Sequence, residues 1–349
     1  MGVESRLCAT HGGVPQCAEV GTSEFQRIKP DFLYYAPGLA DAVDSLVSQS
    51  DVLHGHGLYV GTNYLLGAQA RRQGKALVYH VHGFFEPYIL QRSRWKKRLV
   101  HLLFEDRNFA RVRLWRALTL KEADQIRGRG ILGPIVVAPN GLDTAAYSKP
   151  AEPSATIATP LVPVLSKARS RLLFLARLHP KKGLDLLLHA WAGLIGRFPD
   201  WELVIAGPDE HGHLAEMKSL AQSLGIDERV IFTGSVAGQA KLSLLYSADV
   251  FTLPSYSEGL PMGLLEAMAC ERTVVATEAC NCPEIAKLGA GWLCQPNIKS
   301  LTSALSSALV TDEVERAQRG REGKRLVQQA YSWSNIAAEL LRACDLHCS

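Results

Sequence analysis

The chain has 349 residues, with 38 lysines and arginines against 34 aspartates and glutamates, which leaves a formal charge of +4. Because 47% of the residues are hydrophobic and 21% are charged, the composition excludes a disordered, collagen-like or coiled-coil chain. At roughly 150 residues per domain, the length predicts about two domains. So small a net charge gives no indication of nucleic-acid binding.

The sequence carries no signal for export or membrane insertion. No stretch reaches the roughly 18 consecutive apolar residues that a membrane-spanning helix needs, and the first residues are too polar for a signal peptide. Arg6 stands where N-myristoylation requires Ser or Thr. These observations predict a cytoplasmic protein.

The cysteines are spaced irregularly, in a chain too long to depend on disulfide bonds. Four of them could supply thiolates to a tetrahedral zinc ion: Cys270, Cys280, Cys282 and Cys294. The pair at 280 and 282 lacks the two intervening residues of a usual zinc knuckle. Free thiols are therefore the better interpretation, and we expect no metal site.

The first half of the chain predicts short strands separated by helices. Strands are expected at 5–9, 32–35, 51–54, 76–81 and 135–138, and helices at 65–72 and 122–127. Thr119 and Glu122 form a capping box at the start of the second helix.

Residues 92–116 form the one strongly basic segment. Apolar side chains recur in it at near-helical spacing, which predicts an amphipathic helix. Its cations are Arg92, Arg94, Lys96, Lys97, Arg98, Arg107, Arg111, Arg113 and Arg116. Two interpretations stay open: a helix on an anionic membrane surface, and a solvated helix that packs on the first domain. Nucleic-acid binding fits the segment less well.

The second half alternates strands and amphipathic helices more regularly. Strands are expected at 172–178, 202–206, 230–234, 250–254 and 273–277, with helices at 184–198, 214–224, 240–248 and 262–269. Such alternation predicts a parallel, doubly wound sheet. The fold class is therefore α/β, with two Rossmann-like domains that face a ligand cleft.

The strongest chemical pattern follows the strand expected at 250–254. A glycine-containing turn leads to Pro261, which is suited to the first turn of a helix. Free N–H groups at such a helix start favour a phosphate. Glu258 lies on the turn and Glu266 lies inside the helix, and carboxylates accept hydrogen bonds from sugar or ribose hydroxyls.

Cations follow the first strand of the same domain. Arg177 and Lys182 stand at its carboxyl end, just before a helix. Fixed positive charges in this position would stabilise a leaving diphosphate as its bond to a sugar breaks. Solvated loop charges are the alternative interpretation.

These residues together resemble the large family 4 of retaining GT-B glycosyltransferases, typified by enzymes of exopolysaccharide and lipopolysaccharide synthesis. The family's hallmark is two glutamates separated by seven residues, which matches Glu258 and Glu266. The pair Arg177 and Lys182 also matches, as do the segments 283–285 and 331–333.

The resemblance implies roles for single residues. Glu258 would contact a hydroxyl of the donor sugar, Glu266 the ribose, and Arg177 and Lys182 the diphosphate. The turn would complete the donor site through Gly259, Leu260, Pro261, Met262 and Gly263. His82, in a His-Gly pair after a first-half strand, would lie at the active site, whereas His54 and His56 are expected to be structural.

The resemblance also implies partners and a domain division. The donor would be a nucleotide-diphosphate sugar, the acceptor a glycan or lipid-linked saccharide, and no metal or other cofactor is expected. Residues 1–148 would form the acceptor-side domain, 149–170 a linker, 171–330 the donor domain, and 331–349 a helix that returns to the first domain. The enzyme would be cytoplasmic, with a peripheral position at the inner face of the plasma membrane as the alternative.

Two departures from the family pattern and three alternatives remain. Residues 271–273 replace the usual Gly-x-Pro, and residues 2–10 resemble the family's second strand, so that a first strand is expected to be missing. A misplaced start codon would explain the gap and keep the enzyme interpretation, whereas a truncated gene would favour a catalytically defective nucleotide-sugar-binding relic. A glycosidase also uses paired carboxylates but needs no diphosphate-binding cations. A sugar-nucleotide epimerase would lack the set of Arg177, Lys182 and Glu266.

Overall fold

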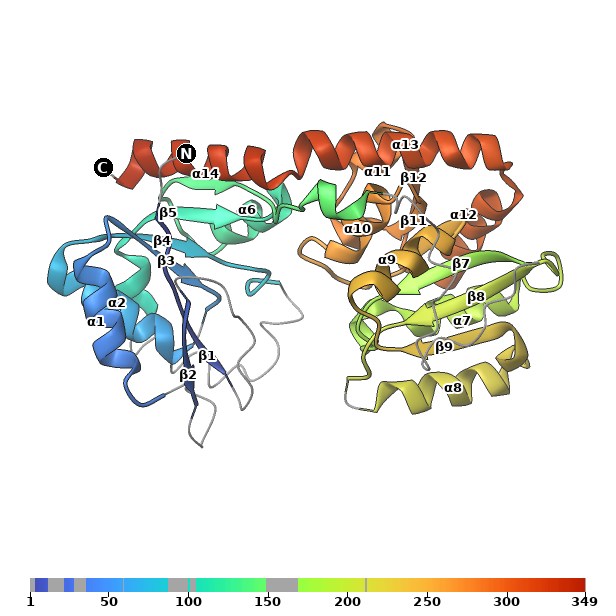
Figure 1. The fold of residues 1–349 in the computed structure, drawn as a ribbon, viewed down its shortest axis with the longest axis horizontal. Coiled ribbons are helices and arrows are strands. Elements are labelled where there is room, and N and C mark those ends of the chain that lie inside the picture. Colours follow the sequence, from blue (N-terminus) through green and yellow to red (C-terminus); the bar gives the residue numbers. More distant parts are fainter. Residues whose placement is uncertain are drawn as a thin grey trace. The chain divides into compact units, whose positions relative to one another are not determined.

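The computed structural model describes residues 4–11, 22–27, 36–58, 60–86, 100, 105–148, 169–210 and 212–348. The chain divides into two compact units (Figure 1). The first contains Met1–Pro139 and Ala337–Ser349, and the second contains Asn140–Ile336. Each unit is built from parallel strands and helices.

The second unit contains a six-stranded parallel sheet among the described residues, in the order β12-β11-β10-β7-β8-β9. Its strands are β7 (Ser170–Leu175), β8 (Trp201–Ala206), β9 (Val230–Gly234), β10 (Val250–Leu253), β11 (Thr273–Thr277) and β12 (Gly291–Cys294). The order reverses between β7 and β10. In sheets of this kind, ligands bind beyond the carboxyl ends of the strands near such a reversal.

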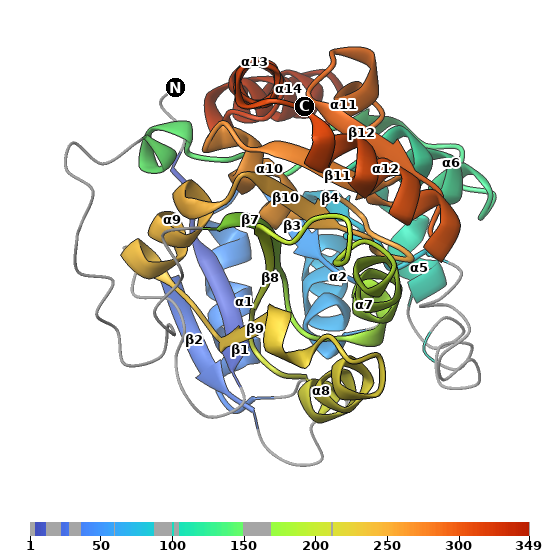
Figure 2. The same cartoon turned by 90° about the vertical axis from the view of Figure 1, so that its right-hand side faces the viewer.

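Helices connect these strands and form two layers (Figure 2). One layer contains α7 (Leu184–Ala192), α8 (His213–Ser223) and α12 (Ile298–Val310), and the other contains α10 (Met262–Ala269) and α13 (Glu313–Ala330). The remaining elements are η3 (Thr144–Tyr147), η4 (Pro180–Lys182), η5 (Asp227–Arg229), α9 (Gly238–Ser247), η6 (Glu278–Cys280) and α11 (Glu284–Lys287). Every residue of β8, β10 and β11 is buried, as expected for strands covered on both faces.

The first unit contains two separate parallel sheets in its described part. One pairs β1 (Leu7–His11) with β2 (Thr22–Gln26), and the other has the order β3-β4-β5-β6. The strands of the larger sheet are β3 (Val52–His56), β4 (Ala76–His80), β5 (Val112–Ala117) and β6 (Ile135–Val137). The helices are α1 (Leu39–Ser48), α2 (Gly61–Gln73), α5 (Asp106–Phe109), α6 (Leu120–Arg127) and the end of α14 (Trp333–Cys348).

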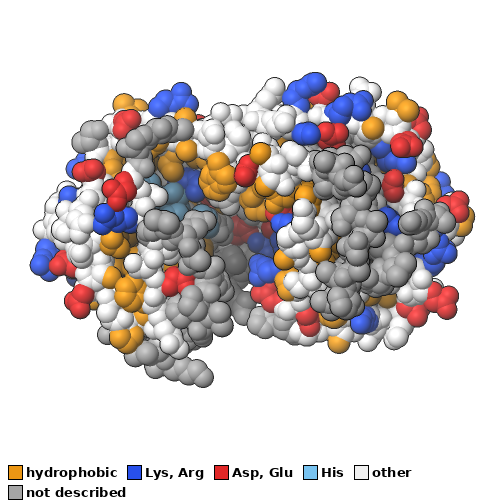
Figure 3. Space-filling model, viewed as in Figure 1, with side chains coloured by type: hydrophobic (Ala, Val, Ile, Leu, Met, Phe, Trp, Pro, Cys, Tyr) orange, Lys and Arg blue, Asp and Glu red, His pale blue; other side chains and the backbone are white. Residues whose placement is uncertain are grey.

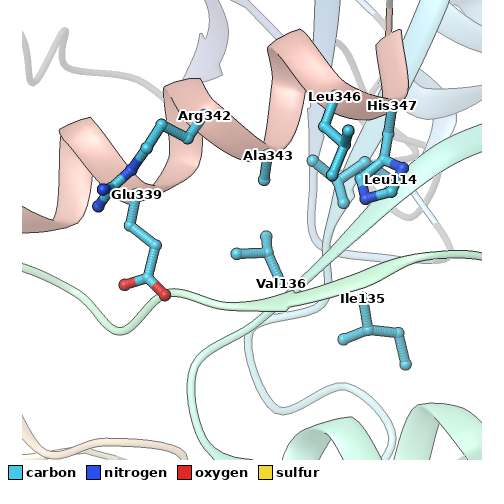
Figure 4. A pocket seen from close by; sticks show the side chains of 8 residues that line it. All are labelled: Leu114, Ile135, Val136, Glu339, Arg342, Ala343, Leu346 and His347. Carbon is cyan, nitrogen blue, oxygen red and sulfur yellow. The ribbon is translucent and has the colours of Figure 1, made fainter.

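Opposite faces of the four-stranded sheet are covered by different helices. Leu77 and Trp115 pack in one core with side chains of α1 and α2, whereas Val78 and Leu114 pack with Cys344 of α14. Beside this second contact lies a shallow hollow between the sheet and α14 (Figure 4). It is lined by Leu114, Ile135, Val136, Glu339, Arg342, Ala343, Leu346 and His347.

The predicted amphipathic helix at 92–116 is wrong at its C-terminal end. Arg113 and Arg116 lie in β5, which pairs with β4 and β6. A strand buried from 114 to 117 on both faces has no alternation of polar and apolar residues that would indicate a strand, and its arginines were counted as part of the basic segment. Residues 92–99 and 101–104, like the strand predicted at 32–35, lie outside the described residues.

Three local expectations can be compared with the structure. Thr119 caps α6 by accepting a hydrogen bond from the N–H of Glu122, but the Glu122 carboxylate binds elsewhere, so only half of the capping box forms. Pro261 is the N-cap of α10 rather than its first helical residue. The four cysteines that were considered for zinc are buried free thiols.

No helix in the described part of the chain is long and apolar enough to cross a membrane.

Candidate functional site

Residues 255–261 connect β10 to α10 and are fixed at both sides. The N–H of Tyr256 donates to the carbonyl oxygen of Lys181 at 2.9 Å, and the N–H of Glu258 donates to that of Ala279 at 3.0 Å. These contacts hold the loop between the segments that follow β7 and β11. The loop therefore lies at the carboxyl ends of the central strands, as predicted from the sequence.

Glu258 is buried, and one of its carboxylate oxygens accepts two hydrogen bonds. Its Oε1 accepts from Nζ of Lys182 at 2.6 Å and from Oγ of Ser255 at 2.7 Å. The Asn281 side-chain amide donates to the carbonyl oxygens of Glu258 and Gly259. The structure thus brings together Glu258 and Lys182, two of the predicted site residues. Their ion pair is well shielded, because only 14% of the Lys182 side chain and 9% of the Glu258 side chain are exposed.

Two glycines allow close backbone contacts at this site. Gly183 has φ +68°, and a Cβ there would lie 2.1 Å from the carbonyl oxygen of Pro254. A Cβ on Gly263 would lie 2.9 Å from that of Leu175, at the end of β7. The N–H of Leu264 donates to the carbonyl oxygen of Pro261 at 3.1 Å. Because α10 begins with no side-chain cap, the N–H groups of Met262 and Gly263 are available to an anion.

Glu266 lies in α10 and repeats the arrangement seen at Glu258. Its Oε1 accepts from the hydroxyl of Tyr147 at 2.9 Å and from Nζ of Lys241 at 2.9 Å. Burial raises the pKa of Tyr147, and the nearby charge of Glu266 and the hydrogen bond to it raise this pKa further. Neither Tyr147 nor Lys241 was selected from the sequence, because their positions in the chain are far from both glutamates.

Arg177 does not contact either glutamate. Its guanidinium binds Glu210 through contacts of 2.9 and 2.7 Å to the two carboxylate oxygens. The pair is open to solvent, with 63% of the Arg177 side chain exposed. A diphosphate at Arg177 would therefore replace an existing carboxylate partner.

His82 belongs to a cluster of four histidines in the first unit, where histidine side chains reach the surface (Figure 3). His56 Nδ1 lies 3.0 Å from His82 Nε2, and His54 Nδ1 lies 2.8 Å from His80 Nε2. The His56 and His80 rings stack with their centroids 4.2 Å apart. His54 and His56, expected to be structural, are thus in the same network as His82.

Arg116 determines the proton positions in one of the two histidine pairs. Its guanidinium donates to Nδ1 of His80 at 3.0 Å and is anchored on the carbonyl oxygens of Ala138 and Pro139. Since Nδ1 of neutral His80 accepts, its proton is on Nε2 and is donated to His54. Burial, assisted by neighbouring histidines and Arg116, lowers the pKa of His82 to about 4 and also lowers that of His80.

A metal ion does not suit this cluster well. One ring nitrogen from each of His56, His80 and His82 lies within 4.8 Å of the others, which is close enough for three imidazoles to converge on an ion. The fixed positive charge of Arg116 beside His80 would repel a cation. The arrangement favours a network of uncharged imidazoles.

Glu122 holds the turn that carries His82. His82 has φ +52°, an uncommon value for a residue with a side chain. The next residue, Gly83, donates its N–H to Oε1 of Glu122, and Leu118 donates its N–H to Oε2 at 2.5 Å. From the sequence, Glu122 was expected only to cap α6. Its buried carboxylate instead ties α6 to the His82 turn.

The fold and the carboxyl-end sites define a protein with two parallel α/β units of the GT-B type. The expected fold class is confirmed by solved structures that match most of the chain. One is the Anabaena protein HepE in complex with UDP and glucose, with 20% identity, a TM-score of 0.75, and coverage of 94% of this chain and 86% of that chain.

Two family models match successive parts of the sequence. Residues 1–146 match Glycosyltransferase Family 4, and residues 163–326 match Glycosyl transferases group 1. The chain therefore contains, in succession, a Glycosyltransferase Family 4 domain and a Glycosyl transferases group 1 domain.

Several of the curated relatives are glycosyltransferases whose names contain inositol, and two others are uncharacterized glycosyltransferases. Phosphatidyl-myo-inositol mannosyltransferase of Mycolicibacterium smegmatis is 29% identical over 60% of this chain and 51% of its own length. D-inositol 3-phosphate glycosyltransferase of Actinosynnema mirum is 27% identical over 88% of this chain and 77% of its own length. The chain spans about half the length of the first relatives that it matches.

Proposed function

We propose that the protein is a glycosyltransferase that moves a sugar from a nucleotide-diphosphate sugar to a hydroxyl of an acceptor. The observation that carries the proposal is the arrangement of Glu258 with Lys182, beside the uncapped start of α10. A carboxylate for sugar hydroxyls, a cation and free N–H groups for phosphate are the groups that a sugar diphosphate requires.

The chemistry follows from these groups. In transfer, the bond between C1 of the sugar and the diphosphate oxygen breaks, and its electron pair leaves with the diphosphate. The acceptor oxygen forms the new bond to C1, and its proton passes to the departing diphosphate oxygen. Lys182, Arg177 and the start of α10 would stabilise the charge that develops on the leaving group. Arg177 would leave Glu210 and Lys182 would loosen from Glu258 as the diphosphate binds.

The finer parts of the proposal concern stereochemistry and acceptor. Retention of configuration is supported by the spacing of Glu258 and Glu266, which resembles that of retaining enzymes. A lipid-linked or inositol-containing acceptor is supported by the names of the relatives, and a glycan acceptor in cell-surface polysaccharide synthesis remains within the same proposal. His82 would contact the reacting sugar. We also propose a reaction without metal, on the cytoplasmic side of the membrane.

The first test is titration calorimetry of the purified chain with UDP, GDP and ADP, on wild type, Glu266→Ala and Arg177→Ala. We expect one diphosphate to bind and both substitutions to weaken it. The matched control is Arg325→Ala, because the Arg325–Glu322 pair on α13 is as exposed as Arg177–Glu210. A folded protein that binds none of the three would contradict the proposal.

Turnover is tested with the sugar diphosphates of the nucleotide that binds. Release of the free nucleoside diphosphate in the presence of an inositol-phosphate or lipid-linked acceptor supports transfer, and NMR of the product reports the anomeric configuration. Tight binding of the donor with no release under any acceptor would favour the relic interpretation.

A further inference from the structure

Tyr147 and Lys241 meet at the carboxylate of Glu266, from parts of the chain separated by 94 residues. We propose that they are positioning residues: together they occupy Oε1 of Glu266 and so present Oε2 to the ribose hydroxyls of a nucleoside diphosphate. The inference rests on the proposed function and adds two residues to the donor site.

The contacts at Glu266 leave one oxygen for a ligand. Both donors, the Tyr147 hydroxyl and Nζ of Lys241, bind Oε1 at 2.9 Å. An ionised carboxylate offers about four lone-pair sites over its two oxygens, and two donors fill those of Oε1. No hydrogen bond engages Oε2 among the described residues, and 13% of the Glu266 side chain is exposed.

Tyr147 is held in place by its own segment. Its carbonyl oxygen accepts from the hydroxyl of Tyr246 at 2.6 Å. At the other end of the segment, the N–H of Leu142 donates to the carbonyl oxygen of Tyr331 at 2.7 Å. Asp143 caps η3 through the N–H of Ala145. The phenol therefore reaches Glu266 from a segment fixed to the second unit rather than from a free linker.

Lys241 interacts electrostatically with both Tyr147 and Glu266. Its Nζ lies 3.4 Å from the Tyr147 hydroxyl and 5.7 Å from the centre of the Tyr147 ring. Burial opposes its positive charge, but the hydrogen bond and charge of Glu266 outweigh burial and raise the pKa of Lys241. The ammonium thus stays charged and fixes the orientation of the carboxylate.

The same arrangement at Glu258 supports a functional interpretation. There too, one hydroxyl and one lysine share Oε1, while no hydrogen bond engages Oε2 among the described residues. Two glutamates eight positions apart are thus each oriented by one hydroxyl and one lysine. These four donor residues come from four different parts of the unit. The stability of α10 does not require these two donors on Glu266, because a solvated glutamate at this position would stabilise the helix equally well.

The oxygen that remains suits a pair of adjacent hydroxyls. Two neighbouring hydroxyls can donate to one carboxylate, and hydrogen bonds to a charged acceptor are stronger than those between neutral groups. In a nucleoside diphosphate, the ribose 2′- and 3′-hydroxyls form this pair. A ligand without them would gain nothing from a correctly oriented Glu266.

The experiment compares a nucleoside diphosphate with its 2′,3′-dideoxy form. Calorimetry with UDP, GDP and ADP first identifies the base, and the affinity ratio of ribose to dideoxyribose forms is then measured. We expect wild type to prefer the ribose form by roughly tenfold. Tyr147→Phe should reduce this preference to about threefold by weakening only the ribose form. A merely structural role would lower both affinities and leave the ratio unchanged.

The lysine is tested with two substitutions. Lys241→Met should lower the ribose preference, and Lys241→Arg should restore most of it because the charge is kept. The controls are Lys324→Met, which removes a comparable exposed ion pair with Glu271, and Tyr64→Phe on α2. In a Glu266→Gln background, Tyr147→Phe should cause no further loss, since coupled residues are not additive.

The outcomes separate the two proposals. Binding of none of the three diphosphates by wild type would overturn both the proposed function and this inference. Binding that Glu266→Gln weakens, with an unchanged ribose preference in folded Tyr147→Phe and Lys241→Met, would overturn this inference alone. Thermal melting establishes that each variant is folded.

Discussion

The two candidate sites differ in how their charged groups are compensated. In the second unit, Glu258 and Glu266 each meet a lysine, so their charges are paired at 2.6 and 2.9 Å. In the first unit, the buried Arg116 guanidinium contacts carbonyl oxygens and an imidazole, and burial lowers the pKa of His80 and of His82, which favours their uncharged forms. An ion-paired site can exchange one anionic partner for another, whereas a site of neutral imidazoles suits a neutral hydroxyl.

This difference agrees with the two halves of a transfer reaction. A sugar diphosphate carries anionic charge and would compete with Glu258 and Glu210 for lysine and arginine. An acceptor hydroxyl carries none, and a neutral His82 could exchange a hydrogen bond with it without the cost of a buried charge. The comparison yields four predictions, of which the first should have the largest effect.

Lys182→Met should lower kcat/KM by at least about 100-fold, because it removes a phosphate-binding cation and leaves Glu258 as a buried, unpaired carboxylate. The measurement is release of nucleoside diphosphate from the sugar nucleotide, with Lys324→Met as the control. Activity within a few-fold of wild type in the Lys182 variant would show that the ion pair is only structural.

Glu122→Gln should lower the free energy of unfolding of the protein by about 2 kcal/mol. The buried carboxylate accepts N–H groups of Gly83 and Leu118, and an amide provides only one oxygen for the two. Chemical denaturation measures the change, with the exposed Glu228→Gln as control. If the two variants are equally stable, Glu122 does not hold the His82 turn.

The regular second unit could be predicted from sequence, whereas the first could be predicted only in part. Strands β7 to β11 were found because alternating strands and helices repeat there, and Glu258, Lys182 and Glu266 were found because they follow strand ends. β5 was missed because it is buried on both faces and lies in a basic segment.

The contacts missed at the sites all join residues far apart in the chain. Tyr147 and Lys241 reach Glu266 across 119 and 25 positions, and Glu122 reaches Gly83 across 39. Local patterns carry no information about such pairs. The two His-x-His sequences, at 54–56 and 80–82, could have indicated the histidine cluster. They lie on the paired parallel strands β3 and β4, whose register places His56 opposite His80. The pairing of β3 with β4 was needed to recognise it.

Acid should destabilise the protein through the histidine cluster. The pKa of His82 falls from 6.5 to about 4 on folding, so the unfolded chain binds protons that the folded chain cannot. The stability due to neutral histidines is complete above pH 6.5 and is lost as pH falls toward 4. We expect Tm to fall by at least about 4 °C between about pH 7.5 and about pH 5.

A histidine variant separates this effect from other titrations. Burial raises the pKa of Glu122, which acts in the opposite direction to the histidines. His80→Asn should therefore show a smaller pH dependence of Tm than wild type, while the exposed His189→Asn should behave like wild type. Identical pH dependence in all three proteins would mean that the cluster is not protected from protonation.

Glu210→Gln should have the smallest effect and the opposite sign. The substitution frees Arg177 from a carboxylate that a diphosphate would have to displace. Because an exposed ion pair contributes at most about 1 kcal/mol, the affinity for the nucleoside diphosphate should rise by no more than about fivefold. Glu322→Gln frees Arg325 from an equally exposed pair and should leave the affinity unchanged. The gain should shrink at high salt, because salt screens the competing carboxylate in wild type as well. A weaker affinity in the Glu210 variant would instead mean that Glu210 orients Arg177 toward the ligand, so that the second unit would keep this ion pair during binding rather than exchange it.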